Sequence, residues 1–112
     1  MEGINDSEAY KLIETGKPVM VFCHATWCGP CVELEPAIID LTQEYGNDID
    51  IVSIEVDKNT RLATEQNVRN IPTVLFFNDG SLKTRIIGAH PIHDYKDVLD
   101  SLLKIEVKED DK

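Results

Sequence analysis

The sequence predicts an α/β domain in which a mixed β-sheet carries helices on both faces. Two observations predict this class. Residues 19–57 have the pattern of a strand, a helix and a second strand, a unit with parallel strands and a right-handed crossover. Residues 73–88 hold two strands around an Asp-Gly pair, a strong hairpin signal that makes those strands antiparallel. Helices elsewhere in the chain can then cover both faces of one sheet.

The chain is expected to begin with a short helix and a buried strand. Ser7 is a helix-capping residue type, and the helix should run to about Glu14 and stop at Gly16. The continuous apolar run VMVFCH, residues 19–24, is typical of a strand buried on both faces. Side chains alternate along a strand. The two faces are therefore Val19, Val21 and Cys23 on one side and Met20, Phe22 and His24 on the other.

A longer helix is predicted from Gly29 to about Tyr45, because apolar residues recur there at three- and four-residue spacing. Those residues are Leu34, Ala37, Ile38, Leu41 and Tyr45. Pro30 is compatible with the first turn of this helix. Pro36 lies inside the helix and should kink it near Val32.

The second half of the chain completes the predicted sheet. A strand is expected over residues 49–57, a short helix capped by Asn59 or Thr60 and ending near Glu65, and the hairpin over 73–88. A last helix should span about 92–105. With 112 residues we expect one domain, with its core at about 7–105 and a charged tail at 106–112 whose last five residues should fray.

Composition excludes some function classes. The 21 acidic side chains outnumber the 11 Lys and Arg, and the net charge of −10 disfavours nucleic acids and anionic membrane surfaces. The first residues lack the basic and apolar regions of a secretory signal. No apolar stretch approaches the roughly 20 residues that span a bilayer. We therefore expect a cytoplasmic protein.

The chemistry of the chain is concentrated in WCGPC, residues 27–31. Cys28 precedes a helix, whose free N–H groups and dipole stabilise a thiolate. Cys31 lies about one turn further on, close enough to attack a mixed disulfide on Cys28. Gly29-Pro30 form the stiff link between them, and Trp27 offers a flat apolar surface to a peptide. These residues predict dithiol–disulfide exchange.

Two other interpretations of the C-x-x-C pair compete with redox chemistry. It could be half of a zinc site, with two ligands from Cys23, His24, His90 and His93, but none of these has a recognised ligand spacing. It could also be a fixed structural disulfide, which an intracellular location disfavours. We therefore expect no metal.

Several motifs together resemble the thioredoxin family, in order and with similar spacing. They are ATWCGPC with Pro36 five residues after Cys31, Val56-Asp57, NIPTVLFFNDG and Gly88. The resemblance covers the chain from about Ser7 to Leu103. It implies the thioredoxin fold and a thiol–disulfide oxidoreductase.

The resemblance also assigns roles to residues by position. Cys28 matches the exposed nucleophile and Cys31 the buried resolving thiol. Ile71-Pro72 matches the family's cis-proline, which implies that the Ile71 backbone pairs with an extended client as an added strand. From the sequence alone, a trans proline that starts an edge strand is the simpler expectation. Gly88-Ala89 would line the remaining edge of the docking surface, although a strand end can also require a glycine.

The implied function is reduction of protein disulfides, in electron transport and cell redox homeostasis. No bound cofactor is implied beyond the redox-active Cys28–Cys31 disulfide, and electrons would come from a thioredoxin reductase that uses flavin and NADPH. The partners would be that reductase and client proteins with disulfides, and we expect a monomer. The alternative is a thioredoxin-like binding or redox-sensing module with weak reductase activity.

The sequence departs from the family pattern around the dithiol. Phe22 stands where thioredoxins usually have a buried aspartate, and Ser53 stands in place of its partner lysine. Loss of both avoids a stranded charge, so we expect a stable fold whose resolving step is slower or uses water or another base. Val32 replaces a common lysine, while Cys23 should act as a small buried hydrophobe. His24 is either a base that tunes Cys28 or serves Cys31, or a core histidine with one backbone hydrogen bond.

Overall fold

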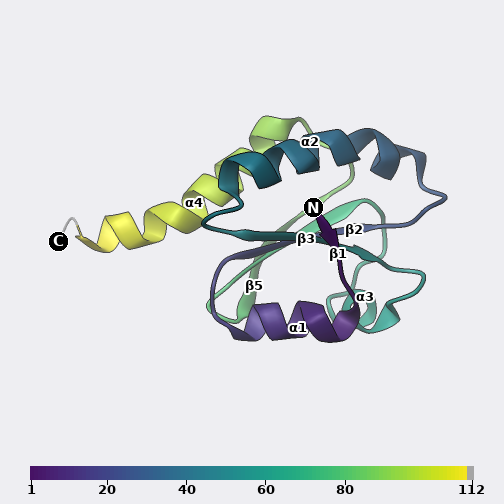
Figure 1. Ribbon diagram of the computed structural model, residues 1–112, viewed down its shortest axis with the longest axis horizontal. Coiled ribbons are helices and arrows are strands. Elements are labelled where there is room, and N and C mark those ends of the chain that lie inside the picture. The colour runs from purple at the N-terminus through teal and green to yellow at the C-terminus, as the bar shows by residue number, and fades with distance from the viewer. Residues whose placement is uncertain (111–112) are drawn as a thin grey trace.

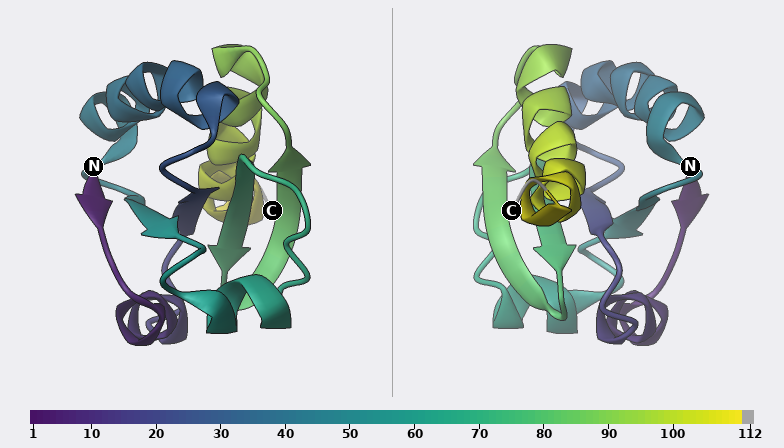
Figure 2. Two further views of the ribbon diagram at one scale, coloured as in Figure 1. Left: turned by 90° about the vertical axis from the view of Figure 1, so that its right-hand side faces the viewer. Right: turned by 90° about the vertical axis from the view of Figure 1, so that its left-hand side faces the viewer.

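The computed structural model describes residues 1–110, with side chains through residue 103. Five strands form one sheet and four helices cover it (Figure 1). In chain order the elements are β1 (Glu2–Gly3), α1 (Asp6–Glu14), β2 (Val19–His24), α2 (Gly29–Tyr45), β3 (Asp50–Glu55), α3 (Thr60–Glu65), β4 (Thr73–Asn78), β5 (Ser81–Ile87) and α4 (Ile92–Asp110). Helices α2 and α4 lie on one face, and α1 and α3 lie on the other (Figures 1 and 2).

The sheet is mixed, as predicted. Its strand order is β1-β3-β2-β4-β5. Strand β2 runs parallel to β3 and antiparallel to β4, and β4 and β5 form the expected hairpin. Asp79 and Gly80 both have positive φ, 55° and 81°, which matches the twist that two-residue hairpin turns require. The α/β class and the parallel crossover are therefore confirmed.

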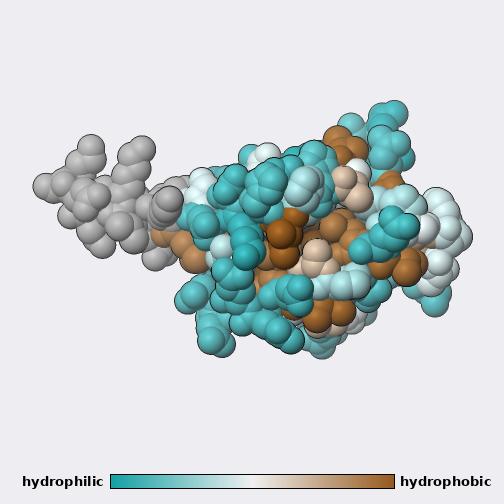
Figure 3. All heavy atoms as spheres, turned by 90° about the horizontal axis from the view of Figure 1, so that it is seen from above, coloured by the Kyte–Doolittle hydropathy of each residue, from teal (hydrophilic) through white to brown (hydrophobic). Residues whose placement is uncertain are grey.

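Each face of the sheet has its own apolar core, and this explains the unbroken apolar sequences of β2 and β4. The α2/α4 side buries one set of strand residues, among them Met20, Phe22, Val74 and Phe76. The α1/α3 side buries the alternate set, among them Val21, Cys23, Leu75 and Phe77. Seen from the α2/α4 side, apolar side chains are visible between hydrophilic ones (Figure 3). None of the helices within residues 1–110 is long and apolar enough to cross a membrane.

The predicted cap of the first helix is wrong. The helix begins at Asp6, and Asn5 is the N-cap: its side chain accepts a hydrogen bond from the Glu8 N–H at 2.8 Å. The Glu8 carboxylate accepts one from the Asn5 N–H at 3.0 Å. This reciprocal capping box satisfies two backbone donors, which Ser7 inside the first turn cannot do.

Helix α3 is capped by a residue far away in the sequence. The Asn59 side chain does not cap it. Instead the Asp6 carboxylate accepts hydrogen bonds from the N–H groups of Arg61 and Leu62, both at 3.0 Å. Asn59 bonds the Asp6 N–H at 3.3 Å and the Glu55 carbonyl at 3.1 Å. These bonds fasten α1 to α3 below the sheet.

Three boundaries also differ from the prediction. The two-residue strand β1 pairs with β3 at the sheet edge and was not predicted, because so short a segment has no periodicity to detect. Strand β3 is shorter, at Asp50–Glu55. Helix α4 continues to Asp110, past the expected end near 105, and residues 111–112 lie outside the described part.

Candidate active site

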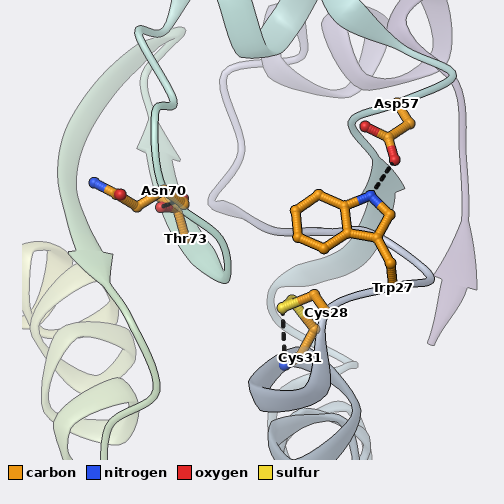
Figure 4. Close-up of a disulfide and its surroundings, with 6 residues drawn as sticks. All are labelled: Trp27, Cys28, Cys31, Asp57, Asn70 and Thr73. Carbon is orange, nitrogen blue, oxygen red and sulfur yellow. Dashed lines mark hydrogen bonds between the residues drawn. A yellow bond between two sulfur atoms is a disulfide. The ribbon is translucent and has the colours of Figure 1, made fainter.

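The two cysteines of the WCGPC segment lie at the start of α2, just after the loop that connects it to β2. Strand β2 ends at His24, and α2 begins at Gly29 with Cys28 as its N-cap. Cys28 and Cys31 form a disulfide with a Cα–Cα distance of 5.3 Å. The Cys28 Sγ accepts a hydrogen bond from the Cys31 N–H at 3.2 Å (Figure 4). An N–H that points at a sulfur from a helix start stabilises negative charge on it once the bond is reduced.

The expected exposure of Cys28 is wrong for this disulfide state. Cys28 is 4% exposed and Cys31 is 2% exposed, so both are buried. The reason is the bond itself, which turns the Cys28 sulfur toward Cys31 and the first turn of α2. Trp27 is 69% exposed and Val32 is 59% exposed, so the disulfide is flanked by apolar surface.

Trp27 is held by a contact across the sheet edge. Its indole Nε1–H donates to the Asp57 Oδ2 at 2.6 Å (Figure 4). The Val56 N–H donates to the His24 carbonyl at 2.9 Å, which places the residues after β3 beside those after β2. The sequence motif contained Asp57, but its contact with Trp27 was missed. The parallel order of β2 and β3 was the available signal, because their carboxyl ends meet at one edge.

The structure brings Trp27 and Ile71 together. Both line a cleft of about 270 Å³ whose other walls include Val56, Val68 and Arg69. The Ile71–Pro72 peptide bond is cis, and Pro72 is buried. In the same loop the Thr73 hydroxyl donates to the Asn70 carbonyl (Figure 4).

Gly88 and Ala89 lie next to this loop. The Gly88 N–H donates to the Pro72 carbonyl at 2.8 Å, and Gly88 has a φ of 84°, a conformation that favours glycine. Ala89 follows and is exposed. Four of the predicted docking residues thus form two connected pairs, Trp27 with Ile71 and Pro72 with Gly88.

His24 lies in a cleft that it shares with Cys31 and not with Cys28. Its ring stacks on Phe22, with centroids 5.3 Å apart and planes 18° apart. His24 and Cys31 line a second cleft of about 250 Å³, which also includes Glu35. Glu35 was missed by the sequence analysis. Its position four residues after Cys31 on one helix was the available signal, because such residues share a helix face.

Phe22, Ser53 and Cys23, among the positions that depart from the family pattern, are buried and uncharged in the structure. Phe22 and Ser53 are neighbours on β2 and β3, and both are buried. In the part of the chain with described side chains, no buried polar side-chain atom lacks a hydrogen bond. Cys23 is fully buried in the α1/α3 core, and burial raises the pKa of its thiol to about 12, so it stays protonated and inert as predicted.

The alternative of a zinc site receives no support from the described residues. Among them no group of three or more His, Cys, Asp or Glu side chains is placed to hold a metal ion. The two distant histidines both contact Asp94: His90 Nδ1 lies 2.9 Å and His93 Nε2 lies 3.2 Å from its carboxylate oxygens.

Comparisons with known proteins agree with the geometry. The family model described as Thioredoxin matches residues 3–101. The M-type chloroplast thioredoxin of Spinacia oleracea is 39% identical over 104 residues, 92% of this chain but 58% of the spinach chain. The thioredoxin of Mycoplasmoides gallisepticum is 37% identical over 95 residues, 85% of this chain and 94% of its own. The oxidised mitochondrial thioredoxin 3 of Saccharomyces cerevisiae has a TM-score of 0.80 at 34% identity, with 89% and 94% of the two chains covered.

Proposed function

The chain belongs to the thioredoxin family of thiol–disulfide oxidoreductases, and on that premise we propose that it reduces disulfides of protein clients. One observation carries the proposal. Cys28 caps the start of α2 and forms a disulfide with Cys31 one turn later, beside an exposed tryptophan. A pair that interconverts between dithiol and disulfide needs this proximity, and a nucleophile benefits from a helix start.

The proposed reaction has two exchange steps. The Cys28 thiolate attacks one sulfur of the client disulfide, and the electron pair of the broken bond leaves with the other client sulfur, which takes a proton. The Cys31 thiolate then attacks the Cys28 sulfur, which closes the Cys28–Cys31 disulfide and releases the second client sulfur as a thiol. The client gains two electrons and two protons, and the chain loses them.

The client would bind as an extended segment across the connected pairs described above. The Trp27 ring and Ile71 supply an apolar wall, and Asp57 holds the ring in place. Pro72, Gly88 and Ala89 would form the opposite edge. Such docking by backbone pairing is a general mode of peptide recognition. Gly29 and Pro30 set the spacing of the two sulfurs at the helix start.

The remaining partners follow from the same proposal. A thioredoxin reductase that uses flavin and NADPH would return two electrons to the Cys28–Cys31 disulfide. We place the protein in the cytoplasm as a monomer that needs no other bound cofactor. These assignments rest on the family resemblance and on the composition of the chain.

Turnover of a model client tests the proposed function. With dithiothreitol as electron source, catalytic amounts of the chain should accelerate insulin reduction, followed as turbidity from the precipitating B chain. Cys28→Ser should fall to the rate of dithiothreitol alone, because Cys23 is buried and Cys31 acts second in the proposed order. Turnover by Cys28→Ser at the parent rate, or none by the parent, would contradict the proposal and favour a binding module.

A further inference from the structure

Cys31 lines the second cleft, and Cys28 does not. The cleft lies between the end of β2 and the first two turns of α2, and its lining includes Phe22, His24, Cys31, Val32 and Glu35. Cys28 and Trp27 do not line it. The cleft therefore opens onto the thiol of the second exchange step, and the docking cleft beside Trp27 is separate from it.

The second exchange step needs a thiolate on Cys31. An ordinary thiol with a pKa near 8.5 is mostly protonated at neutral pH. Cys31 is 2% exposed and lies inside the helix, so it lacks the position at the helix start that Cys28 has. Burial disfavours the charged form of a thiol. A proton acceptor near Cys31 would accelerate the step.

His24 and Glu35 are the titratable side chains that line this cleft together with Cys31. His24 comes from β2, and Glu35 lies one turn after Cys31 on the same face of α2. Among the side chains that the structure describes, neither forms a hydrogen bond or an ion pair with another side chain. Both are therefore available to a thiol or a water molecule in the cleft.

The other charged groups near His24 and α2 are engaged elsewhere or lie off the cleft. Glu55 on β3 is the register neighbour of His24, and its carboxylate lies 3.7 Å from the Lys58 Nζ. Asp57 accepts the Trp27 indole N–H. Glu33 also belongs to α2 but does not line the cleft.

We propose that His24 accepts the Cys31 proton during the second exchange step, directly or through one water, and that Glu35 stabilises the imidazolium formed. This inference rests on the proposed function and gives the resolving step a base where the family's buried aspartate is replaced by Phe22. The Cys31 sulfur attacks Cys28, the bond from Cys28 to the client breaks, and the electron pair leaves with the client sulfur. The proton on His24 then passes to that thiolate or to solvent. Histidine suits this role because it is the side chain that most often transfers protons in catalysis.

A two-phase reaction with 5,5′-dithiobis(2-nitrobenzoate) separates the steps. Cys28 of the reduced chain attacks the reagent and releases one thionitrobenzoate in the first phase. Cys31 releases the second by attacking the mixed disulfide. At pH 8, His24→Gln should slow the second phase by about tenfold, and Glu35→Gln should slow it about two- to fivefold. The first phase should stay at the parent rate in both variants.

The direction of the Glu35→Gln effect decides between two roles. A carboxylate that acted only as a static negative charge would raise the pKa of the Cys31 thiol, so its removal would accelerate the second phase. A carboxylate that supports His24 has the opposite effect. The second-phase rate should rise with pH as His24 loses its proton. This rise should occur at lower pH in Glu35→Gln and be absent in His24→Gln.

Glu33→Gln is the matched control, because it removes the same charge from the same helix outside the cleft. His24→Phe keeps a ring to stack on Phe22 and should slow the second phase like His24→Gln. Equal second-phase rates in Glu35→Gln and Glu33→Gln, or a parent rate in both His24 variants, would overturn the inference. Either result leaves insulin reduction through Cys28 and Cys31 intact, whereas loss of both phases in the parent would contradict the proposed function itself.

Discussion

Cys31→Ser is expected to accumulate covalent complexes with client proteins that the parent chain releases. In this variant Cys28 still attacks the client disulfide, but no second sulfur is placed to break the mixed disulfide. Turnover of insulin should fall to the uncatalysed rate. The complexes should appear on non-reducing gels of a cell extract passed over the immobilised variant, and dithiothreitol should release them.

The other two cysteines supply the controls for this trap. Cys28→Ser should form no complexes, because Cys31 acts only in the second step of the proposed order. Cys23→Ala in the Cys31→Ser background should trap clients as well as Cys31→Ser alone, since the Cys23 thiol is buried in the opposite core. Trapping by Cys28→Ser and none by Cys31→Ser would reverse the roles of the two active-site sulfurs.

Phe22→Asp is expected to lower the free energy of unfolding by about 3–5 kcal/mol at pH 7. It removes a ring that is 1% exposed and places a carboxylate between Ser53 and Val74, its neighbours on β3 and β4. Neither neighbour carries a positive charge. The apolar surroundings would raise the pKa of the new carboxyl in the folded state above its unfolded value. The loss of unfolding free energy relative to the parent should therefore become smaller as the pH falls and the carboxyl becomes protonated.

Urea unfolding of two further variants separates charge from lost packing. Phe22→Leu replaces the ring with a smaller apolar side chain and introduces no charge. It should lower the free energy of unfolding by about 1–2 kcal/mol. Adding Ser53→Lys to Phe22→Asp should recover part of the loss, because the two positions are register neighbours. If Phe22→Asp and Phe22→Leu unfold at the same urea concentration, this position tolerates a carboxylate. The joint replacement of the family's aspartate and lysine by Phe22 and Ser53 would then have no energetic basis.

The elements that the sequence predicts well are those with a local signal. The bounds of β2 and α2 follow from an unbroken apolar run and from apolar spacing, and the Asp79-Gly80 turn follows from residue types that accept positive φ. The caps were less predictable. Asp6 reaches the start of α3 across more than 50 residues of sequence, and no local pattern reports such a contact.

The site divides in the same way. The Cys28–Cys31 pair and its place at a helix start depend on neighbours in sequence, and both were predicted. The Trp27–Asp57 hydrogen bond depends on how β2 and β3 align, and the cleft shared by Cys31 and Glu35 depends on how α2 packs on β2. The exposure that the resemblance implied for Cys28 is not seen, because Cys28 and Cys31 are both buried in the closed disulfide.

The reduction potential of the Cys28–Cys31 pair tests the proposed reductase most directly. The chain has one tryptophan, Trp27, adjacent to the disulfide, so its fluorescence can report the redox state in dithiothreitol buffers of known potential. We predict a strongly reducing value, at about −270 mV. A value near about −120 mV, typical of a disulfide donor, would contradict it.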